Sequence, residues 1–314
     1  MDALSSTPAQ PRSITALRRA IAAGRFAVTA EFGPPVDPRP DPIRDAARRF
    51  AGLVDAVNVT DNQAATVKVS ALACASILVA EGVEPILQVT GRDRNLMALQ
   101  SELLGAWTLG VRTVLALSGD PLTVGHYDGA ATHVRDLDSL GLTELIRAMN
   151  CGVLAAGEPL AHPPNFEIVA AANPLVDQPA RLAAKLQAGA TLLQTNIVYD
   201  IDRFLQWLGP IVDGGITERA SMLVGVTPPR STRMLEHLHR NIPGVEVDDE
   251  TFARMAGRQG DAAKAEGIAI AAELIERLRA LPDVAGVHLM APGWEAEAVP
   301  AILAAAGLTA SSGQ

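Results

Sequence analysis

The ten residues Phe26–Pro35, FAVTAEFGPP, carry the first clear structural signal in this chain. The apolar run Phe26–Ala30 predicts a buried strand. Gly33-Pro34-Pro35 must end that strand, because proline cannot continue a hydrogen-bonded ladder and glycine permits a sharp exit. A carboxylate, Glu31, is therefore expected where a core strand emerges into a turn. Burial without a partner favours the protonated form of an acid, which suits a general acid; the alternative is a surface glutamate that begins a loop.

The alternation that begins with this strand continues along the chain, because short β-rich runs alternate with amphipathic helical stretches. Strands are expected at 26–31, 55–60, 85–90, 113–118, 166–171, 192–198, 221–226 and 286–290. Helices are expected at 14–23, 42–51, 66–81, 95–109, 138–150, 180–188, 201–212, 231–240, 249–280 and 298–306. Eight strands, each followed by a helix, predict an α/β fold, a single (β/α)8 TIM barrel with an extra N-terminal helix at 14–23. An open doubly wound sheet is the alternative, but the glycine-rich fingerprint expected after its first strand is missing.

The domain organisation predicted from this pattern is one catalytic barrel over residues 13–308, between a disordered tail at 1–12 and a flexible tail at 309–314. The chain has 314 residues, of which 48% are hydrophobic, and this is ample for a large core. The polar, Pro/Ser-rich start does not resemble a signal peptide, and no apolar run approaches the roughly 18 residues of a membrane span. We therefore expect a cytoplasmic protein.

Charge and cysteine content exclude further classes. A net charge of −9 without a clustered Lys/Arg stripe argues against a nucleic-acid binder. Cys74 and Cys151 form no CxxC pair, so they are expected to be buried free thiols. The six histidines are scattered without the spacing of metal ligands, and no metal site is expected.

The barrel prediction directs attention to polar residues at the carboxyl ends of the strands, where such barrels place their chemistry. Gln88, Gln194 and Asn196 interrupt apolar strands, so these side chains need buried partners or a ligand. The obvious acids among the strand ends are Glu31 and Asp120. A mouth rich in neutral hydrogen-bonding groups suits a flat, polyamide-like heterocycle better than a phosphorylated sugar. His288, in the last strand, is interpreted as a core histidine.

Several segments resemble, in the expected order, the methylenetetrahydrofolate reductase family. They are AEFGPP at 30–35, VNVTDNQ at 57–63, LQVTGRDRN at 87–95, LALSGD at 115–120, and AGA at 188–190 followed by QTN at 194–196 and YD at 199–200. The resemblance runs from about Phe26 to Leu308. It is closest to the short bacterial type that lacks a regulatory domain. Ordered matches of this kind are far more specific than any one of them alone.

The resemblance implies an oxidoreductase that reduces 5,10-methylenetetrahydrofolate to 5-methyltetrahydrofolate with NAD(P)H, usually through bound FAD, in one-carbon metabolism and methionine biosynthesis. It implies that Glu31 is the general acid, which protonates the bridging nitrogen so that the ring opens to an iminium that accepts hydride. Asp120 is implied to contact the pterin's amino-pyrimidine edge and to influence the flavin. The implied folate contacts are Asp120, Gln194 and Asn196, and the implied flavin contacts are Thr60, Gln88, Ser118, Gly119, His133 and Lys185.

The chain departs from the family pattern mainly around the flavin. Gln88 and Ser118 stand where many relatives have histidine and arginine, and Asn173-Pro174 replaces a Tyr-Pro pair. The connection 176–185 is short and offers fewer cations to a pyrophosphate. FMN, or direct hydride transfer without a flavin, therefore stays open beside FAD.

Two other functions are weighed against the reductase. One is a folate-binding barrel subunit that needs a partner protein or has lost independent catalysis, and either a partner subunit or a homo-oligomer is compatible with the sequence. The other is a barrel lyase or aldolase, for which neither a Schiff-base lysine nor a metal site is visible at a strand end.

Overall fold

The structure, a computed structural model, describes residues 14–308; the tails predicted at 1–12 and 309–314 lie outside the described residues. Eight parallel strands pair in sequence order, and β8 pairs with β1 to close the barrel. The predicted (β/α)8 TIM barrel is therefore confirmed. The strands are β1 (Ala27–Phe32), β2 (Ala56–Val59), β3 (Pro85–Thr90), β4 (Thr113–Leu117), β5 (Glu167–Ala172), β6 (Leu192–Ile197), β7 (Ser221–Val226) and β8 (Gly286–Leu289).

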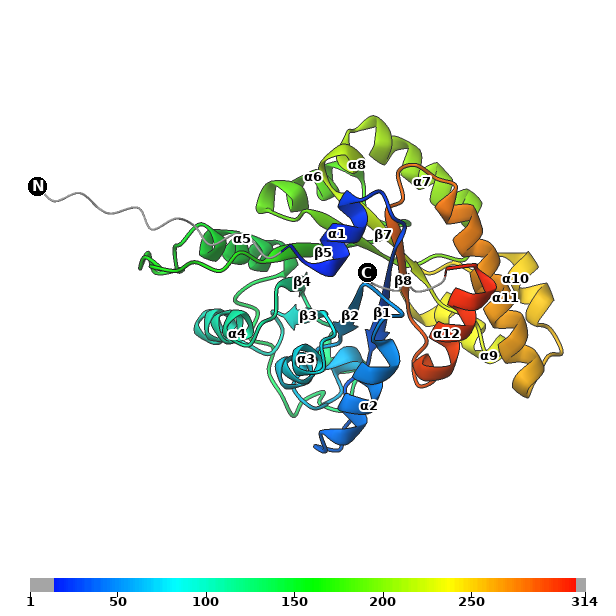
Figure 1. Cartoon of the computed structure of the whole chain (residues 1–314), viewed down its shortest axis with the longest axis horizontal. Coiled ribbons are helices and arrows are strands. Elements are labelled where there is room, and N and C mark those ends of the chain that lie inside the picture. The colour runs from blue at the N-terminus through cyan, green and yellow to red at the C-terminus, as the bar shows by residue number, and fades with distance from the viewer. Residues whose placement is uncertain (1–13, 309–314) are drawn as a thin grey trace, which may run out of the picture.

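Helices surround the strands (Figure 1). They are α1 (Ala16–Ala22), α2 (Asp41–Phe50), α3 (Ala71–Ala80), α4 (Leu96–Thr108), α5 (Ser139–Asn150), α6 (Pro179–Ala188), α7 (Ile201–Asp213), α8 (Ile216–Arg219), α9 (Thr232–Asn241), α10 (Asp249–Met255), α11 (Gly260–Arg279) and α12 (Glu295–Ala305). Two short 3-10 turns, η1 (Gln63–Ala65) and η2 (Leu122–Val124), lie in the loops after β2 and β4.

Two helix predictions needed correction. The helix expected at 249–280 is divided into α10 and α11, because Gly257 takes a left-handed conformation with φ of +73°. The helix expected at 66–81 begins at Ala71, because the preceding segment is held in another conformation by Asn62, whose Oδ1 accepts a hydrogen bond from the Lys68 amide.

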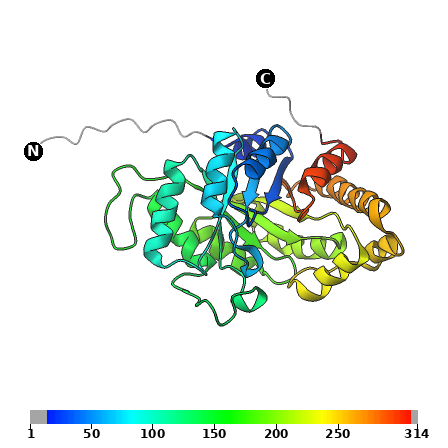
Figure 2. The same ribbon diagram turned by 90° about the horizontal axis from the view of Figure 1, so that it is seen from below.

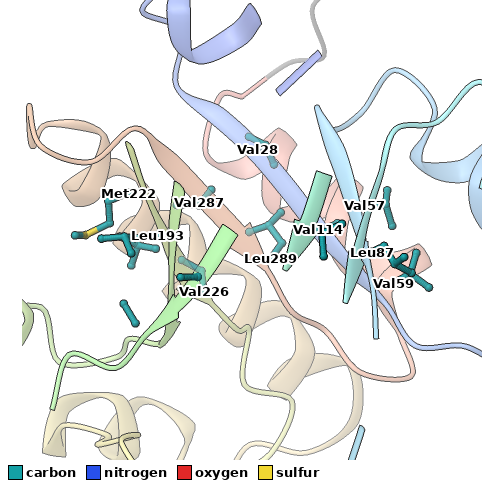
Figure 3. Packing of buried hydrophobic residues seen from close by; sticks show 14 of the residues in the cluster. Val28, Val57, Val59, Leu87, Val114, Leu193, Met222, Val226, Val287 and Leu289 are labelled. Atoms are coloured by element: carbon teal, nitrogen blue, oxygen red, sulfur yellow. The ribbon is translucent and has the colours of Figure 1, made fainter. Parts of the chain in front are cut away.

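The strands separate two cores by the alternation of their side chains. Outward residues such as Val28, Val57, Leu87 and Val287 pack in one large cluster with the helices, as Figure 3 shows. The inward residues nearest the strand starts form a second, smaller cluster that includes Leu17 and Ala20 of α1. Its strand members are Ala27, Ala56, Ile86, Leu115, Val169, Leu192 and Leu223.

Helix α1 thus covers the amino-terminal end of the barrel, and the predicted extra helix is confirmed. Thr15 caps it by accepting a hydrogen bond from the Arg18 amide. In the side view of Figure 2, α1 (dark blue) lies on the opposite side of the molecule from the teal loop after β4. Polar side chains further along the strands are therefore left to the other end of the barrel.

Two further expectations can be compared with the structure. Cys74 is buried as predicted, but the prediction for Cys151 was wrong: it is exposed, because it caps the end of α5 at the surface. Among residues 14–308, no helix is long and apolar enough to cross a membrane.

Candidate functional site

The carboxyl end of the barrel opens into a cavity of about 510 Å³, which we call the mouth. Its lining comes from the ends of the strands and from the loops beyond them, as the barrel geometry requires. Eight of the ten predicted site residues line it: Glu31, Gln88, Ser118, Gly119, Asp120, Lys185, Gln194 and Asn196. A larger hollow of about 680 Å³ on the outer side of α4 receives no residue from a strand end.

Glu31 occupies an inward position near the end of β1, in register with Asn58 of β2. It is 7% exposed, and no described residue donates a hydrogen bond to its carboxylate. Its nearest basic group is Nε2 of His288, 3.9 Å from Oε2. The predicted placement of an acid at the inner edge of a core strand is therefore what the structure shows.

A buried network lies beneath Glu31. His288 Nδ1 is 2.9 Å from Thr29 Oγ1 and 3.4 Å from Asn58 Nδ2, and Asn58 Nδ2 also donates to Gln194 Oε1 at 3.1 Å. Because an amide and a hydroxyl both approach Nδ1, we infer that this nitrogen accepts and that the ring proton is on Nε2. Nε2 has no hydrogen-bond partner among residues 14–308 and faces Glu31.

His288 is fully buried, as a core histidine should be, but its free nitrogen belongs to the site. Thr29 and His288 were not predicted from the sequence as site residues. One signal could have found Thr29: it is two residues before Glu31 on a strand, and therefore on the same face. Nothing in the local sequence around His288 reveals that it pairs across the closure between β8 and β1.

Gln194 and Asn196 differ in how their amides are used. Gln194 lines the mouth, and only its Oε1 is engaged by a described residue. Asn196 donates to the Pro243 carbonyl at 3.1 Å and accepts from the Ile197 amide at 2.8 Å. The register between β6 and β7 shifts after Gln194, and this irregularity alters the alternation at Asn196.

Glu295, at the start of α12, adds an acid that the sequence analysis did not name. Its Oε1 accepts a hydrogen bond from the Gly293 amide at 3.1 Å. Burial raises the pKa of Glu295, and the negative charge of Glu31 raises it further. The two carboxyl groups are thus close enough to influence each other electrostatically. Glu295 lies six residues beyond the end of β8, so its position gave no periodic signal that linked it to the strand ends.

Comparison with known proteins places this barrel among its relatives. The family model for methylenetetrahydrofolate reductase matches residues 16–307. The chain belongs to the methylenetetrahydrofolate reductase family.

Two plant members of this family show the extent of the similarity. The probable methylenetetrahydrofolate reductase (NADH) of Oryza sativa subsp. japonica is 30% identical over 153 residues, which cover 46% of this chain and 25% of that protein. Methylenetetrahydrofolate reductase (NADH) 1 of Arabidopsis thaliana is 29% identical over 219 residues, which cover 66% and 35%. The matched segments thus span a quarter to about a third of the length of these relatives.

Among solved structures, an uncharacterized protein from Clostridium thermocellum that binds two copies of 5-methyl-5,6,7,8-tetrahydrofolic acid has the same fold. The TM-score is 0.63 at 14% identity, over 92% of this chain and 97% of that one.

The flavin that the methylenetetrahydrofolate reductase family implies can be tested against the side chains present. Gln88 lines the mouth and is suited to a heterocycle, whereas Thr60 is buried and does not line it. Ser118 Oγ accepts from the Ser139 amide at 3.0 Å. His133 lies outside the lining, and its Nε2 accepts from the Leu122 amide at 3.2 Å.

The phosphate end of a flavin fits less well. Lys185 donates to the Ala171 carbonyl at 2.7 Å and to Asp177 Oδ2 at 3.0 Å, and Arg181 pairs with the other oxygen of Asp177. Both basic residues that line the mouth therefore share one buried carboxylate, which balances the charge of only one of them. The mouth offers groups for a flat ring, but Lys185 is held by Asp177 and Ala171, which leaves the 63% exposed side chain of Arg181 as its lining cation for a pyrophosphate.

A metal centre is the remaining alternative for this site. Within residues 14–308, no group of three or more His, Cys, Asp or Glu side chains is arranged to hold a metal ion.

Proposed function

We propose that this protein is an oxidoreductase that reduces 5,10-methylenetetrahydrofolate to 5-methyltetrahydrofolate, with NAD(P)H as the electron donor. The observation that carries the proposal is the position of Glu31: a carboxyl group 7% exposed, without a hydrogen-bond donor in the described residues, at the inner wall of the mouth. The family membership supports it, as do the names of the two plant relatives, both reductases that use NADH. The folate bound by the Clostridium protein is compatible with it.

The proposed chemistry begins with a proton transfer. Glu31, in its protonated form, gives its proton to the bridging nitrogen of the folate's five-membered ring. The C–N bond to that nitrogen then breaks, and the methylene carbon becomes an iminium. Hydride from the nicotinamide adds to that carbon, which gives the methyl group and NAD(P)+. A proton from solvent restores Glu31, so one hydride and one proton are consumed per turnover.

The other residues of the mouth have supporting roles in this proposal. His288 lies beneath Glu31 with its unpartnered Nε2 and would stabilise the carboxylate once the proton has left. Gln194 and Asp120 would hydrogen-bond the polar edge of the pterin. Glu31 is only 7% exposed, and this limits access of water to the bond that it protonates.

FAD is the usual cofactor of this family, and for this chain we propose only the residues that would contact its ring. Gln88 and the backbone of Gly119 would contact its ring, and a bound flavin would relay hydride from nicotinamide to folate. Because the lining cations Lys185 and Arg181 are paired with Asp177, we assign no step to a flavin.

The test is steady-state oxidation of NADH and NADPH by purified protein, with and without methylenetetrahydrofolate, after the absorption spectrum has been recorded. We expect folate-dependent oxidation together with formation of 5-methyltetrahydrofolate. A yellow protein that is bleached by NADH and recovers with the folate would assign a flavin; a colourless active protein would assign direct transfer. Folate binding without turnover would overturn the reductase proposal in favour of a binding barrel that requires a partner.

A further inference from the structure

Arg92 lies at the point where three loops of the mouth meet. It follows β3, and it is 3% exposed. Its guanidinium donates to the Asn62 carbonyl in the loop after β2 at 3.2 Å and to the Asp120 carbonyl in the loop after β4 at 3.1 Å. It also donates to both carboxylate oxygens of Asp93, each at 2.7 Å. One buried side chain therefore ties two neighbouring loops to its own.

The loop after β2 is strained where Arg92 holds it. Asn62, Ala64 and Ala65 have φ values of 47°, 53° and 50°, in the left-handed region that costs most L-residues energy. A strained backbone of this kind persists only where its surroundings fix it. Here Arg92 fixes the turn at Asn62, and the packing of η1 on η2 fixes its far end.

Asp120 joins the strained turn to the substrate side of the mouth. Its Oδ2 accepts a hydrogen bond from the Ala64 amide at 2.7 Å, while Arg92 holds its carbonyl. The residue is thus held at both its backbone and its side chain. No described residue donates a hydrogen bond to Oδ1, and the residue lines the mouth.

Two glycines make this crossing possible. A Cβ on Gly119, whose φ is +86°, would lie 2.9 Å from Cβ of Arg92. A Cβ on Gly125 would overlap the carbonyl oxygen of Ala65. The loops can approach this closely because both positions lack a side chain.

We propose that Arg92 is a positioning residue, which holds the 62–65 turn and Asp120 so that the Asp120 carboxylate is presented to the amino-pyrimidine edge of the folate. This inference rests on the proposed function and deepens it. Arginine suits the role because its planar guanidinium offers five donors in fixed directions and stays charged, whereas lysine is a single point of charge. In this proposal the nicotinamide does not contact Arg92. We therefore expect substitutions of Arg92 to change the KM for folate and not the KM for NADH.

The first test compares Arg92→Met with the wild-type protein. We expect the KM for methylenetetrahydrofolate to rise about tenfold, the size of one lost charged hydrogen bond, with the KM for NADH and kcat changed less than about threefold. Arg112→Met is the matched control: Arg112 donates to the carbonyls of Trp107 and Val111 at the opposite end of the barrel. It should leave both KM values unchanged. An equal rise in the KM for NADH would overturn the proposal.

The second test asks whether Arg92 acts through Asp120 and the turn. The folate KM of the Arg92→Met/Asp120→Asn double variant should be about that of Asp120→Asn alone, because both changes remove one function. Ala64→Gly should restore at least half of the loss in Arg92→Met, because glycine adopts the left-handed conformation without cost. Additive effects of the two substitutions, or no recovery with glycine, would contradict the assignment.

A third measurement separates this inference from the reductase proposal. In hydrogen exchange, the Ala64 amide should lose protection in Arg92→Met and keep it in Arg112→Met; Arg92→Lys replaces Arg92→Met if the latter does not fold. Unchanged protection would overturn the positioning role even in an active enzyme. Absence of folate turnover in the wild-type protein, with protection lost in Arg92→Met, would overturn the proposed function but leave the structural role of Arg92 intact.

Discussion

At the amino-terminal end of the barrel, Glu167 of β5 accepts hydrogen bonds from Arg18 at 2.8 and 3.1 Å and from the Thr191 hydroxyl. At the carboxyl end, Glu31 of β1 is less exposed but receives no hydrogen bond from the described residues, and its nearest basic nitrogen is 3.9 Å away. The same side-chain type is thus used in opposite ways at the two ends of one barrel.

The two glutamates differ in whether other protein groups supply their hydrogen bonds. A buried acid that has its partners stabilises the fold, whereas one that lacks them costs free energy and is retained where a ligand supplies the missing partner. Among the described residues, buried side-chain oxygens without a partner occur toward the mouth, in Asn58 and Thr227, and also at the amino-terminal end, in Glu84 and Thr113. For these two glutamates, we therefore expect a substitution of Glu167 to change stability and a substitution of Glu31 to change catalysis.

The largest expected effect is that of Glu31→Gln. Loss of the proposed proton donor should lower kcat with methylenetetrahydrofolate by about 10²- to 10⁴-fold, the usual contribution of a general acid. The midpoint of thermal unfolding should change by less than about 2 °C, because the carboxylate has no donor to lose. Steady-state kinetics and calorimetry on the same preparation measure both quantities. Loss of activity in proportion to loss of folded protein would show that Glu31 is structural.

Glu167→Gln is expected to show the opposite behaviour. The neutral amide weakens the pair with Arg18, whose side chain is 33% exposed, so the free energy of unfolding should fall by roughly 1–3 kcal/mol. For a chain of this size, that lowers the unfolding midpoint by several degrees. The kcat at 25 °C should match the wild-type value. A tenfold loss of kcat in Glu167→Gln would contradict the prediction that Glu167 contributes to stability and not to catalysis.

Within the mouth, Gln194→Ala and Asn196→Ala should separate a substrate contact from a structural one. Both side chains line the cavity, but the amide of Asn196 is hydrogen-bonded to Pro243 and Ile197, so the folate KM should rise about tenfold in Gln194→Ala and less than about threefold in Asn196→Ala. Titration with 5-methyltetrahydrofolate provides an independent measurement. A larger rise in the folate KM for Asn196→Ala than for Gln194→Ala would show that Asn196 is the residue that contacts folate.

The last expected effect is a pH dependence of stability, and it concerns Glu84, which accepts a hydrogen bond from the Ala16 amide at the start of α1. Burial raises the pKa of Glu84 from 4.5 to about 7. The folded state therefore holds this proton more tightly than the unfolded chain, so the stabilisation is complete below pH 4.5 and is lost as the pH rises through 7. In Glu84→Gln, the unfolding midpoint should fall less between pH 5 and 8, by an amount equivalent to roughly 2–3 kcal/mol. Parallel pH profiles would contradict the assignment.

Much of the site could be predicted because strand ends can be recognised locally. An apolar run followed by Gly33-Pro34-Pro35 places Glu31 at an opening, and polar residues inside apolar strands identified Gln88 and Gln194. The state of each side chain could not be predicted in this way. The neutralisation of Lys185 by Asp177 depends on how the loop after β5 folds back on α6. The altered position of Asn196 depends on a register shift between two strands.

By itself, the sequence determined the order of the elements, the closed barrel and the presence of an acid at the first strand end, because hydrophobic periodicity and turn residues act over a few neighbouring positions. Only the tertiary structure decided what surrounds that acid. Thr29 contacts His288, which is 259 residues away in the sequence. Arg92 contacts Asn62 and Asp120, and these three residues lie in three different loops. Such contacts are set by barrel closure and loop packing, and no local pattern encodes them.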